Sequence, residues 1–175
     1  MSGAVDASIH ASAVLVGTRA VLIRGPSGAG KSRLAFDLIL AGRGGQIPPA
    51  LLVGDDRMHL WASGGQLMVR PAPRLSGLIE IRGLGIRRCP FAAEAVLGLV
   101  VDLAASDAER LPAPEKLQTR IHGVQVPRIP VESGFSALPL VVAALTTTEG
   151  TETASFSTDC AKGIGNHMRP SIATE

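Results

Sequence analysis

A phosphate-binding loop with the pattern G-x-x-x-x-G-K-S constrains this chain more than any other feature. The apolar run 20–23 precedes it and the segment 34–40, with apolar residues at helical spacing, follows it, so the motif lies between a predicted strand and a predicted helix. Such a loop points backbone N–H groups at a polyphosphate, and the start of the helix adds positive charge. The loop comprises Gly25, Pro26, Ser27, Gly28, Ala29, Gly30, Lys31 and Ser32.

Two side chains at the end of this loop have predicted roles. Lys31 is expected to reach the β- and γ-phosphates, and the Ser32 hydroxyl is expected to ligate the Mg²⁺ that bridges them. A glycine-rich turn can match the pattern by chance, but here the strand and helix context matches as well. The sequence therefore predicts ATP and Mg²⁺ as cofactors.

The composition is typical of a compact α/β protein of one domain. The chain has 175 residues, of which 46% are hydrophobic and 18% charged. It has no apolar run near the roughly 18 residues of a membrane span, and its N-terminus lacks the basic residues of a signal peptide. A net charge of +2 and 3% aromatic residues disfavour nucleic acid as a partner. We expect a cytoplasmic protein that binds neither membranes nor nucleic acid.

Hydrophobic periodicity predicts the elements around the loop. The segment 9–16 and the strand 20–23 are expected to form a hairpin, and a helix is expected over 31–41, ending at Gly42. His10 would then lie one strand away from the nucleotide. A single histidine in a short strand is more often structural than functional, so the residues alone favour a structural role.

Two acidic residues follow the next buried strand, predicted over 50–54. Asp55 and Asp56 lie directly after this strand and downstream of the phosphate loop. Carboxylates at this position in nucleotide enzymes bind magnesium or accept the proton of the attacking group. The alternative is an ordinary solvated Asp-Asp turn.

The segment 77–86 carries an acid and a base on an apolar background broken by glycines. Glu80 and Arg82 lie two residues apart, so their side chains point the same way if the segment is extended. The pair is compatible with a structural ion pair and also with a magnesium ligand beside a phosphate clamp. Composition does not decide between these alternatives.

The remaining elements follow from the same patterns, and they give a predicted catalytic domain over 1–145. Residues after 145 have little apolar periodicity, which predicts a disordered tail over 146–175. The predicted elements are a hairpin of 57–61 and 66–70, a short helix at 89–97, a buried strand at 98–103, two short strands within 121–131 and a helix at 136–145.

Several separated motifs resemble the HPr kinase/phosphorylase family, bacterial enzymes that phosphorylate a serine of the phosphocarrier protein HPr. The segment Gly-Leu-Ile-Glu-Ile-Arg-Gly-Leu-Gly-Ile at 77–86 looks like the family signature, and Asp55-Asp56 matches its paired acids. His10 falls where the family has its histidine, and Arg110 in Glu-Arg-Leu falls at its catalytic arginine. The four matches occur in the family's order.

This resemblance implies an α/β fold: a P-loop kinase domain with a central mixed β-sheet, like that of phosphoenolpyruvate carboxykinase. It implies a short form that contains only the family's C-terminal catalytic domain. It also implies HPr as the protein partner in phosphotransferase-system regulation, ATP and inorganic phosphate or pyrophosphate as small substrates, and a homo-oligomer, which is a hexamer in the family.

The resemblance also implies residue roles. Lys31 and the loop amides would hold the triphosphate, while Ser32 and Glu80 would ligate magnesium. The implied catalytic residues are His10, Lys31, Asp56 and Arg110. Asp56 would take the proton from the attacking serine and return it in the reverse reaction, the attack of inorganic phosphate on phosphoserine. Arg110 would neutralise charge on the transferred phosphoryl group, and His10 would lie beside the paired acids.

The chain also departs from the family pattern. The segment 132–136 lacks the basic residues that the family carries in the part linked to dephosphorylation. Two other functions remain compatible with the residues: a P-loop kinase for a small metabolite, and a regulatory module that binds a nucleotide without turnover.

Overall fold

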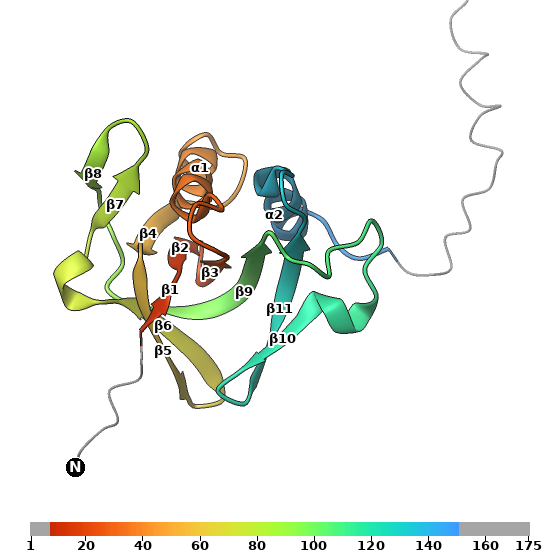
Figure 1. Ribbon diagram of the computed structural model, residues 1–175. Helices are drawn as coiled ribbons and strands as arrows, with labels where there is room; N and C mark the ends of the chain where they lie inside the picture. Colours follow the sequence, from red (N-terminus) through yellow and green to blue (C-terminus); the bar gives the residue numbers. More distant parts are fainter. Residues whose placement is uncertain (1–7, 151–175) are drawn as a thin grey trace, which may run out of the picture.

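The computed structural model describes residues 8–150, which form a mixed α/β fold (Figure 1). The part of the predicted tail from residue 151 onward lies outside the described residues, as do residues 1–7. Short 3-10 turns occur at Pro73–Leu75 and Pro114–Leu117. The elements are β1 (Ile9–His10), β2 (Ser12–Val16), β3 (Arg19–Arg24), α1 (Lys31–Arg43), β4 (Ala50–Gly54), β5 (Arg57–Ser63), β6 (Gln66–Pro71), β7 (Leu78–Ile81), β8 (Gly85–Arg88), β9 (Ala95–Leu103), β10 (Gln118–Ile121), β11 (Val124–Val131) and α2 (Ala137–Thr146).

The central sheet of the described residues has nine strands of mixed direction. Its main order is β1-β5-β6-β9-β3-β2-β4, and β11 pairs with both β9 and β10. Strands β3, β9 and β11 run parallel, whereas β2 is antiparallel to both β3 and β4. Both predicted hairpins are present, as β2–β3 and β5–β6. The prediction that residues 9–10 belong to the first hairpin was wrong, because they form β1 and pair with β5 instead. This sheet confirms the predicted α/β class with a mixed central sheet.

Both faces of the central strands are buried. In β3, Val21 and Ile23 pack with α1 and α2 in one core cluster, while Ala20 and Leu22 pack with β5 and β6 in a second cluster. Figure 1 shows the same arrangement, with both helices on one side of β3 and β9 and the β5–β6 end of the curved sheet on the other. A strand buried on two faces has a continuous apolar sequence, which is why the run 20–23 was recognisable.

Helix α1 is two residues longer than predicted. It begins at Lys31, after Gly30 in a left-handed conformation, and ends at Arg43 with the Gly44 N–H donating to the Leu40 carbonyl at 2.8 Å. The prediction that Gly42 ends the helix was wrong. A Cβ on Gly42 would lie 2.8 Å from the backbone nitrogen of Ala50, so this glycine permits close packing of α1 against β4.

The short helix predicted at 89–97 was wrong. Residues 95–97 belong to β9, where Ala95 pairs with Val69 and both are buried. Residues 91–92 lie beside β4, where Phe91 pairs with Leu52 and the Ala92 N–H donates to the Leu52 carbonyl at 2.8 Å. Alanine favours helices in isolation, but strand pairing and burial override that preference here.

Neither of the two α-helices found among residues 8–150 has the length and apolar character needed to span a membrane.

Candidate active site

The phosphate-binding loop connects β3 to α1, as the motif predicts. A Cβ on Gly25 would come within 2.9 Å of the Leu103 carbonyl oxygen, and Gly25 has a φ of 149°. Gly28 and Gly30 have φ values of 80° and 95°, which other residue types rarely adopt. The loop conformation therefore requires its glycines, and residues 26–28 lie exposed at its surface.

Lys31 lies at the base of this loop and is 6% exposed. Its Nζ donates to the carbonyl oxygens of Gly25 and Pro26, each at 3.0 Å. Burial lowers the pKa of Lys31 below its ordinary value, and the negative charges of Asp55 and Asp56 act in the opposite direction. An ammonium group with three N–H donors, held beside the loop amides, is suited to anion binding.

Asp55 is a buried hydrogen-bond acceptor at the centre of the site. Its side chain lies at the end of β4, and the residue is 5% exposed. Its Oδ1 accepts hydrogen bonds from the Ser12 hydroxyl at 2.5 Å and the Ser32 hydroxyl at 2.9 Å. Its Oδ2 accepts from the Glu80 backbone N–H at 3.1 Å. One carboxylate thus joins β2, α1, β4 and β7.

Asp56 has a different environment although it is the next residue. Its side chain is 59% exposed, and its Oδ1 lies 3.2 Å from the Nε2 of His10. Asp56 has a φ of 74°, which is uncommon outside glycine, and its carbonyl accepts from the Ala11 N–H at 3.3 Å. Backbone strain of this kind concentrates at functional sites. The structure thus directs one acid inward and presents its neighbour to solvent.

The signature segment forms the β7–β8 hairpin, and its two charged residues differ in position. Glu80 is in β7, with an exposed side chain and a backbone N–H bound to Asp55. Arg82 lies in the turn between the strands, so the segment is not extended through both residues. The expectation that the two side chains point the same way required an extended segment, and the turn at Arg82 removes that condition. Figure 1 shows the hairpin projecting from the sheet near α1.

Arg110 lies in the long connection between β9 and β10. It is exposed, and no hydrogen bond or ion pair joins it to another of residues 8–150. Its connection is tethered on both sides, because Arg128 bonds Asp107 and the Lys116 ammonium pairs with Glu109. The structure therefore shows no direct contact between Arg110 and the acids.

An ionic network that the sequence analysis missed lies at the ends of β3, β9 and β11. Arg24, the residue before the phosphate loop, bonds Asp102 through two nitrogens at 2.7 and 2.8 Å. Arg128 bonds Asp102 at 2.5 Å, both oxygens of Asp107 at 2.7 and 2.9 Å, and the Lys116 carbonyl at 3.1 Å. In the sequence, Arg24 and Asp102 are recognisable only as charged residues near the ends of apolar runs. That pattern does not indicate which residue each one pairs with.

The network shifts the ionisation of its members. Burial opposes ionisation of Asp102, but hydrogen bonds from Arg24 and Arg128 outweigh it and hold the pKa of Asp102 below its usual value. The bonds from Arg128 lower the pKa of Asp107 to about 2, and the same contacts raise the pKa of Arg128. Asp102, Asp107 and Arg128 are therefore charged at neutral pH, so these ion pairs hold the strands together electrostatically.

The residues around Asp55 fit a magnesium ion that is bound partly by phosphate. No group of three or more His, Cys, Asp or Glu residues within 8–150 forms a ready metal cage. Mg²⁺ commonly uses one or two protein oxygens, with phosphate oxygens and waters completing its octahedron. The Ser32 hydroxyl donates a hydrogen bond to Asp55, so the lone pairs of the Ser32 oxygen remain available to a cation. The Glu80 carboxylate is exposed on β7, the strand whose Glu80 backbone N–H bonds Asp55.

The geometry brings most of the predicted site residues together. Asp55 connects Ser32 and the Glu80 backbone directly, Asp56 contacts His10, and both acids influence the charge on Lys31. An ammonium, loop amides, a serine hydroxyl and clustered carboxylates make up a site that can hold a polyphosphate and deprotonate a nearby hydroxyl.

Comparison with known proteins identifies a family and several relatives that this chain resembles. Residues 2–160 match the model of the HPr Serine kinase C-terminal domain. An HPr kinase/phosphorylase of Enterococcus faecalis is 38% identical over 157 residues, which cover 81% of this chain and 48% of that protein. One of Mycoplasma mycoides is 31% identical over 150 residues, covering 78% and 46%. The chain thus spans about half the length of the curated relatives that it matches.

A solved structure shares the fold. The HPr(Ser) kinase/phosphatase from Coxiella burnetii superposes with a TM-score of 0.61 at 27% sequence identity, covering 79% of this chain and 92% of that one. The family match extends over most of the sequence, and the mixed α/β sheet is shared with this solved structure. The chain belongs to the HPr serine kinase C-terminal domain family.

Proposed function

We propose that this protein transfers the γ-phosphoryl group of ATP to a serine hydroxyl of the phosphocarrier HPr. Family membership supports the reaction class, and one observation in the structure supports the chemistry. The exposed His10–Asp56 pair lies beside the partly buried Asp55–Ser32 hydrogen bond at the start of α1. A proton acceptor and a phosphate-binding loop thus occur within one connected set of contacts.

The phosphate loop holds the triphosphate. Its amides and the positive end of α1 bind the phosphate oxygens, and Lys31 moves one or more of its N–H donors from the loop carbonyls to the β- and γ-phosphates. Ser32 and Glu80 would hold Mg²⁺, and the ion would supply positive charge against the negative charge of the triphosphate. Asp55 accepts a hydrogen bond from the Ser32 hydroxyl and so fixes the direction of the Ser32 oxygen lone pairs.

Asp56 acts as the general base. The serine oxygen of HPr attacks the γ-phosphorus, the bond from that phosphorus to the β-phosphate oxygen breaks, and the serine proton passes to Asp56. His10 orients the Asp56 carboxylate through its Nε2 contact. Arg110 approaches the transferred group from the β9–β10 connection, where its exposed side chain makes no hydrogen bond or ion pair with another of residues 8–150, and neutralises developing charge.

The same groups support the reverse process. Inorganic phosphate attacks the phosphorus of phosphoserine, the serine oxygen leaves with a proton from Asp56, and pyrophosphate is the second product. The homo-oligomer of the family, a hexamer, belongs to this proposal as well.

The exposure of Asp56 and His10 favours a protein as acceptor. The Asp56 side chain is 59% exposed and that of His10 is 43% exposed, so the base lies at an open surface. A small-metabolite kinase typically encloses its acceptor in a concave pocket. An acceptor serine presented on a folded protein can reach an open base directly.

The test is transfer of labelled γ-phosphate from Mg·ATP to purified HPr. The proposal expects label on an HPr serine. Label on a small molecule would indicate a metabolite kinase, and ATP binding without any transfer would indicate a regulatory module; either result would contradict the proposal.

The base is tested by Asp56→Asn, which keeps a residue type that tolerates positive φ. Transfer should fall by about 10² to 10⁴-fold, while the Kd for ATP changes little. The matched control is Asp37→Asn, which removes a half-buried carboxylate paired with Arg33 on α1 and should leave transfer unchanged. Equal losses of transfer and ATP affinity in Asp56→Asn would show that this side chain binds nucleotide rather than acting as the base.

A further inference from the structure

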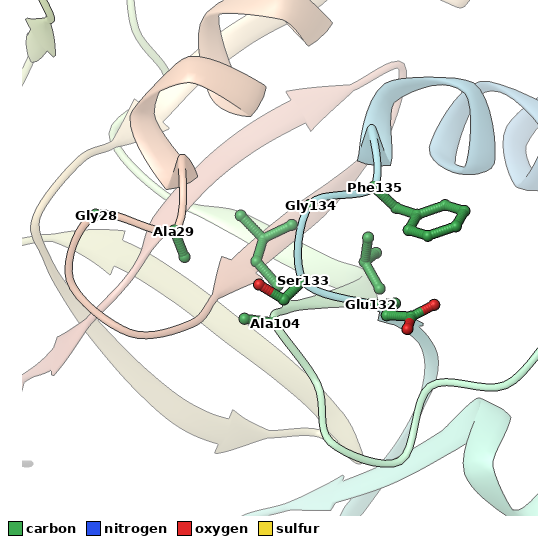
Figure 2. Close-up of a pocket in the computed structure, with 9 residues that line it drawn as sticks. Gly28, Ala29, Ala104, Glu132, Ser133, Gly134 and Phe135 are labelled. Atoms are coloured by element: carbon green, nitrogen blue, oxygen red, sulfur yellow. The ribbon is translucent and has the colours of Figure 1, made fainter.

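A cavity of about 180 Å³ lies beside the phosphate loop, on the side away from the acids. Figure 2 shows Gly28 and Ala29 of the loop on one side of it and the segment after β11 on the other. Gly28 and Ala29 belong to the predicted phosphate loop, but the proposed transfer chemistry assigns no role to the other residues of the lining. Its lining consists of Gly28, Ala29, Leu103, Ala104, Val131, Glu132, Ser133, Gly134 and Phe135.

The cavity is built at the carboxyl ends of three parallel strands. The phosphate loop follows β3, Leu103 ends β9, and Val131 ends β11. In open α/β sheets, ligands bind in the crevice outside the carboxyl ends of parallel strands. The cavity and the phosphate loop therefore occupy one continuous ligand-binding edge of the sheet.

The sheet order determines which end of a nucleotide can lie in this cavity. Asp55 and Asp56 follow β4, which is separated from β3 by β2, whereas β9 and β11 lie on the opposite side of β3. If the terminal phosphorus faces Asp56, the nucleoside must leave the loop in the other direction. That direction leads to the ends of β9 and β11.

The chemistry of the lining suits an uncharged ligand part. Leu103, Val131 and Ala29 give apolar surface, and Glu132 is the one charged residue in the lining. Its negative charge repels phosphate, while its carboxylate and the Ser133 hydroxyl are acceptors suited to ribose hydroxyl groups. Small-molecule sites commonly combine apolar walls with a few polar groups in this way.

The walls of the cavity are fixed by backbone contacts. The Ala105 N–H donates to the Val131 carbonyl at 2.9 Å, which joins the ends of β9 and β11. The Phe135 N–H donates to the Glu132 carbonyl at 3.1 Å, which closes the turn after β11. Ala104 has a φ of 55°, a strained value for alanine of the kind found near ligand sites. The cavity is therefore preformed.

We infer that this cavity binds the ribose and base of the nucleotide whose phosphates the loop holds. The inference rests on the proposed nucleotide-dependent function and adds the location of the nucleoside. It assigns residues 103–104 and 131–135 a role in nucleotide affinity that is separate from phosphate binding. Tight binding of the nucleoside moiety then adds affinity for ATP and ADP over the corresponding inorganic phosphates.

The test compares ADP with inorganic pyrophosphate, which carries the same two phosphate groups without a nucleoside. Ser133→Trp places a large ring in the cavity from an exposed position. It should weaken ADP binding by about tenfold or more, while the Kd for pyrophosphate changes by less than about twofold. Ser63→Trp is the matched control, because Ser63 lies at the exposed end of β5, outside the lining, and both constants should stay unchanged.

The outcomes separate this inference from the proposed function. Equal weakening of ADP and pyrophosphate by Ser133→Trp, or no weakening of either, would overturn the nucleoside assignment while the phosphate site stands. If wild-type protein binds neither ligand, the proposed function fails and the inference fails with it.

Photolabelling gives a direct second measurement that needs no variant. Irradiation of wild-type protein with 8-azido-ADP should label peptides containing residues 103–104 or 131–135, and excess ADP should suppress the label. Specific label confined to the segment 55–82 would place the adenine base of the nucleotide on the side of Asp55 and Asp56, and would overturn the inference.

Discussion

At the scale of single residues, the two adjacent acids show how environment divides roles. Asp55 is 5% exposed and accepts from three donors, whereas the side chain of Asp56 is 59% exposed and contacts His10. A carboxylate fixed by several hydrogen bonds stabilises the structure around it. An exposed carboxylate with one partner is free to exchange a proton with a substrate. We therefore expect the two Asp→Asn variants to behave differently.

Asp55→Asn should lower the free energy of unfolding by about 1–3 kcal/mol, because an amide cannot accept on both sides as a carboxylate does and leaves a buried donor unpaired. Asp56→Asn is the neighbouring control and should change it by less than about 0.5 kcal/mol, because the side chain is exposed. Urea unfolding followed by circular dichroism measures both. Similar stability of the two variants would show that the Asp55 hydrogen bonds contribute little.

Asp107→Asn should destabilise the protein near neutral pH but not in strong acid. The bonds from Arg128 lower the pKa of Asp107 from 3.8 to about 2. Because the folded-state pKa lies below the unfolded value, the stabilisation is complete above the unfolded pKa and is lost as the pH falls through about 2. Unfolding free energies of the variant and wild type, measured from about pH 7 down to about pH 2, should converge. A difference that is independent of pH would contradict an ionic cause.

At the scale of elements, α1 and β4 approach each other through a glycine. A Cβ on Gly42 would lie 2.8 Å from both the Cβ and the backbone nitrogen of Ala50, contacts that folded proteins do not tolerate. Close packing here sets the distance between α1, which follows the phosphate loop, and β4, which ends just before Asp55. The glycine therefore contributes to the geometry of the site although it lies far from it along α1.

Gly42→Ala separates helix propensity from packing. Propensity alone predicts a gain of about 1 kcal/mol, but the clash with Ala50 should produce a net loss of about 1–3 kcal/mol. Gly44→Ala is the control, since a Cβ there meets the Leu40 carbonyl at 3.4 Å and Gly44 has a φ of −79°. Thermal unfolding should show a lower Tm for the first variant and little change for the second. A rise in Tm for Gly42→Ala would mean that β4 moves away at little cost.

At the scale of the whole molecule, two core clusters lie on opposite faces of one sheet. Leu38 of α1 belongs to the first cluster and Leu22 of β3 to the second, and both side chains are fully buried. Helix α2 completes the first cluster with Ala137 and Val141. Residues 8–150 thus contain both cores, which supports our proposal that the catalytic domain ends close after α2.

Ending the chain after Gly150 should leave the Tm within about 3 °C of wild type and should preserve pyrophosphate binding, because both cores are retained. Ending it after Gly134 is the contrasting variant. It removes α2 and exposes apolar core surface, which should cost several kcal/mol at about 25 cal/mol per Å². Differential scanning calorimetry measures both. A large loss of Tm in the first variant would show that the domain needs residues beyond 150.

Local patterns in the sequence determined a large part of this protein. The phosphate loop between a strand and a helix, the strand before Asp55 and the β5–β6 hairpin were all predicted, because each depends on residues close together in the chain. The family was recognisable for the same reason, since its motifs are short segments with distinctive residues. Family membership and the mixed α/β class were confirmed.

Tertiary structure decided the features that depend on partners distant in the chain. Residues 95–97 form a strand because β6 pairs with them, although their composition suits a helix. Asp55 is buried because Ser12 and Ser32 supply hydrogen bonds from other elements, and Arg24 meets Asp102 only because β3 and β9 are neighbours. Periodicity records which side of an element is apolar, but it carries no information about which element covers that side.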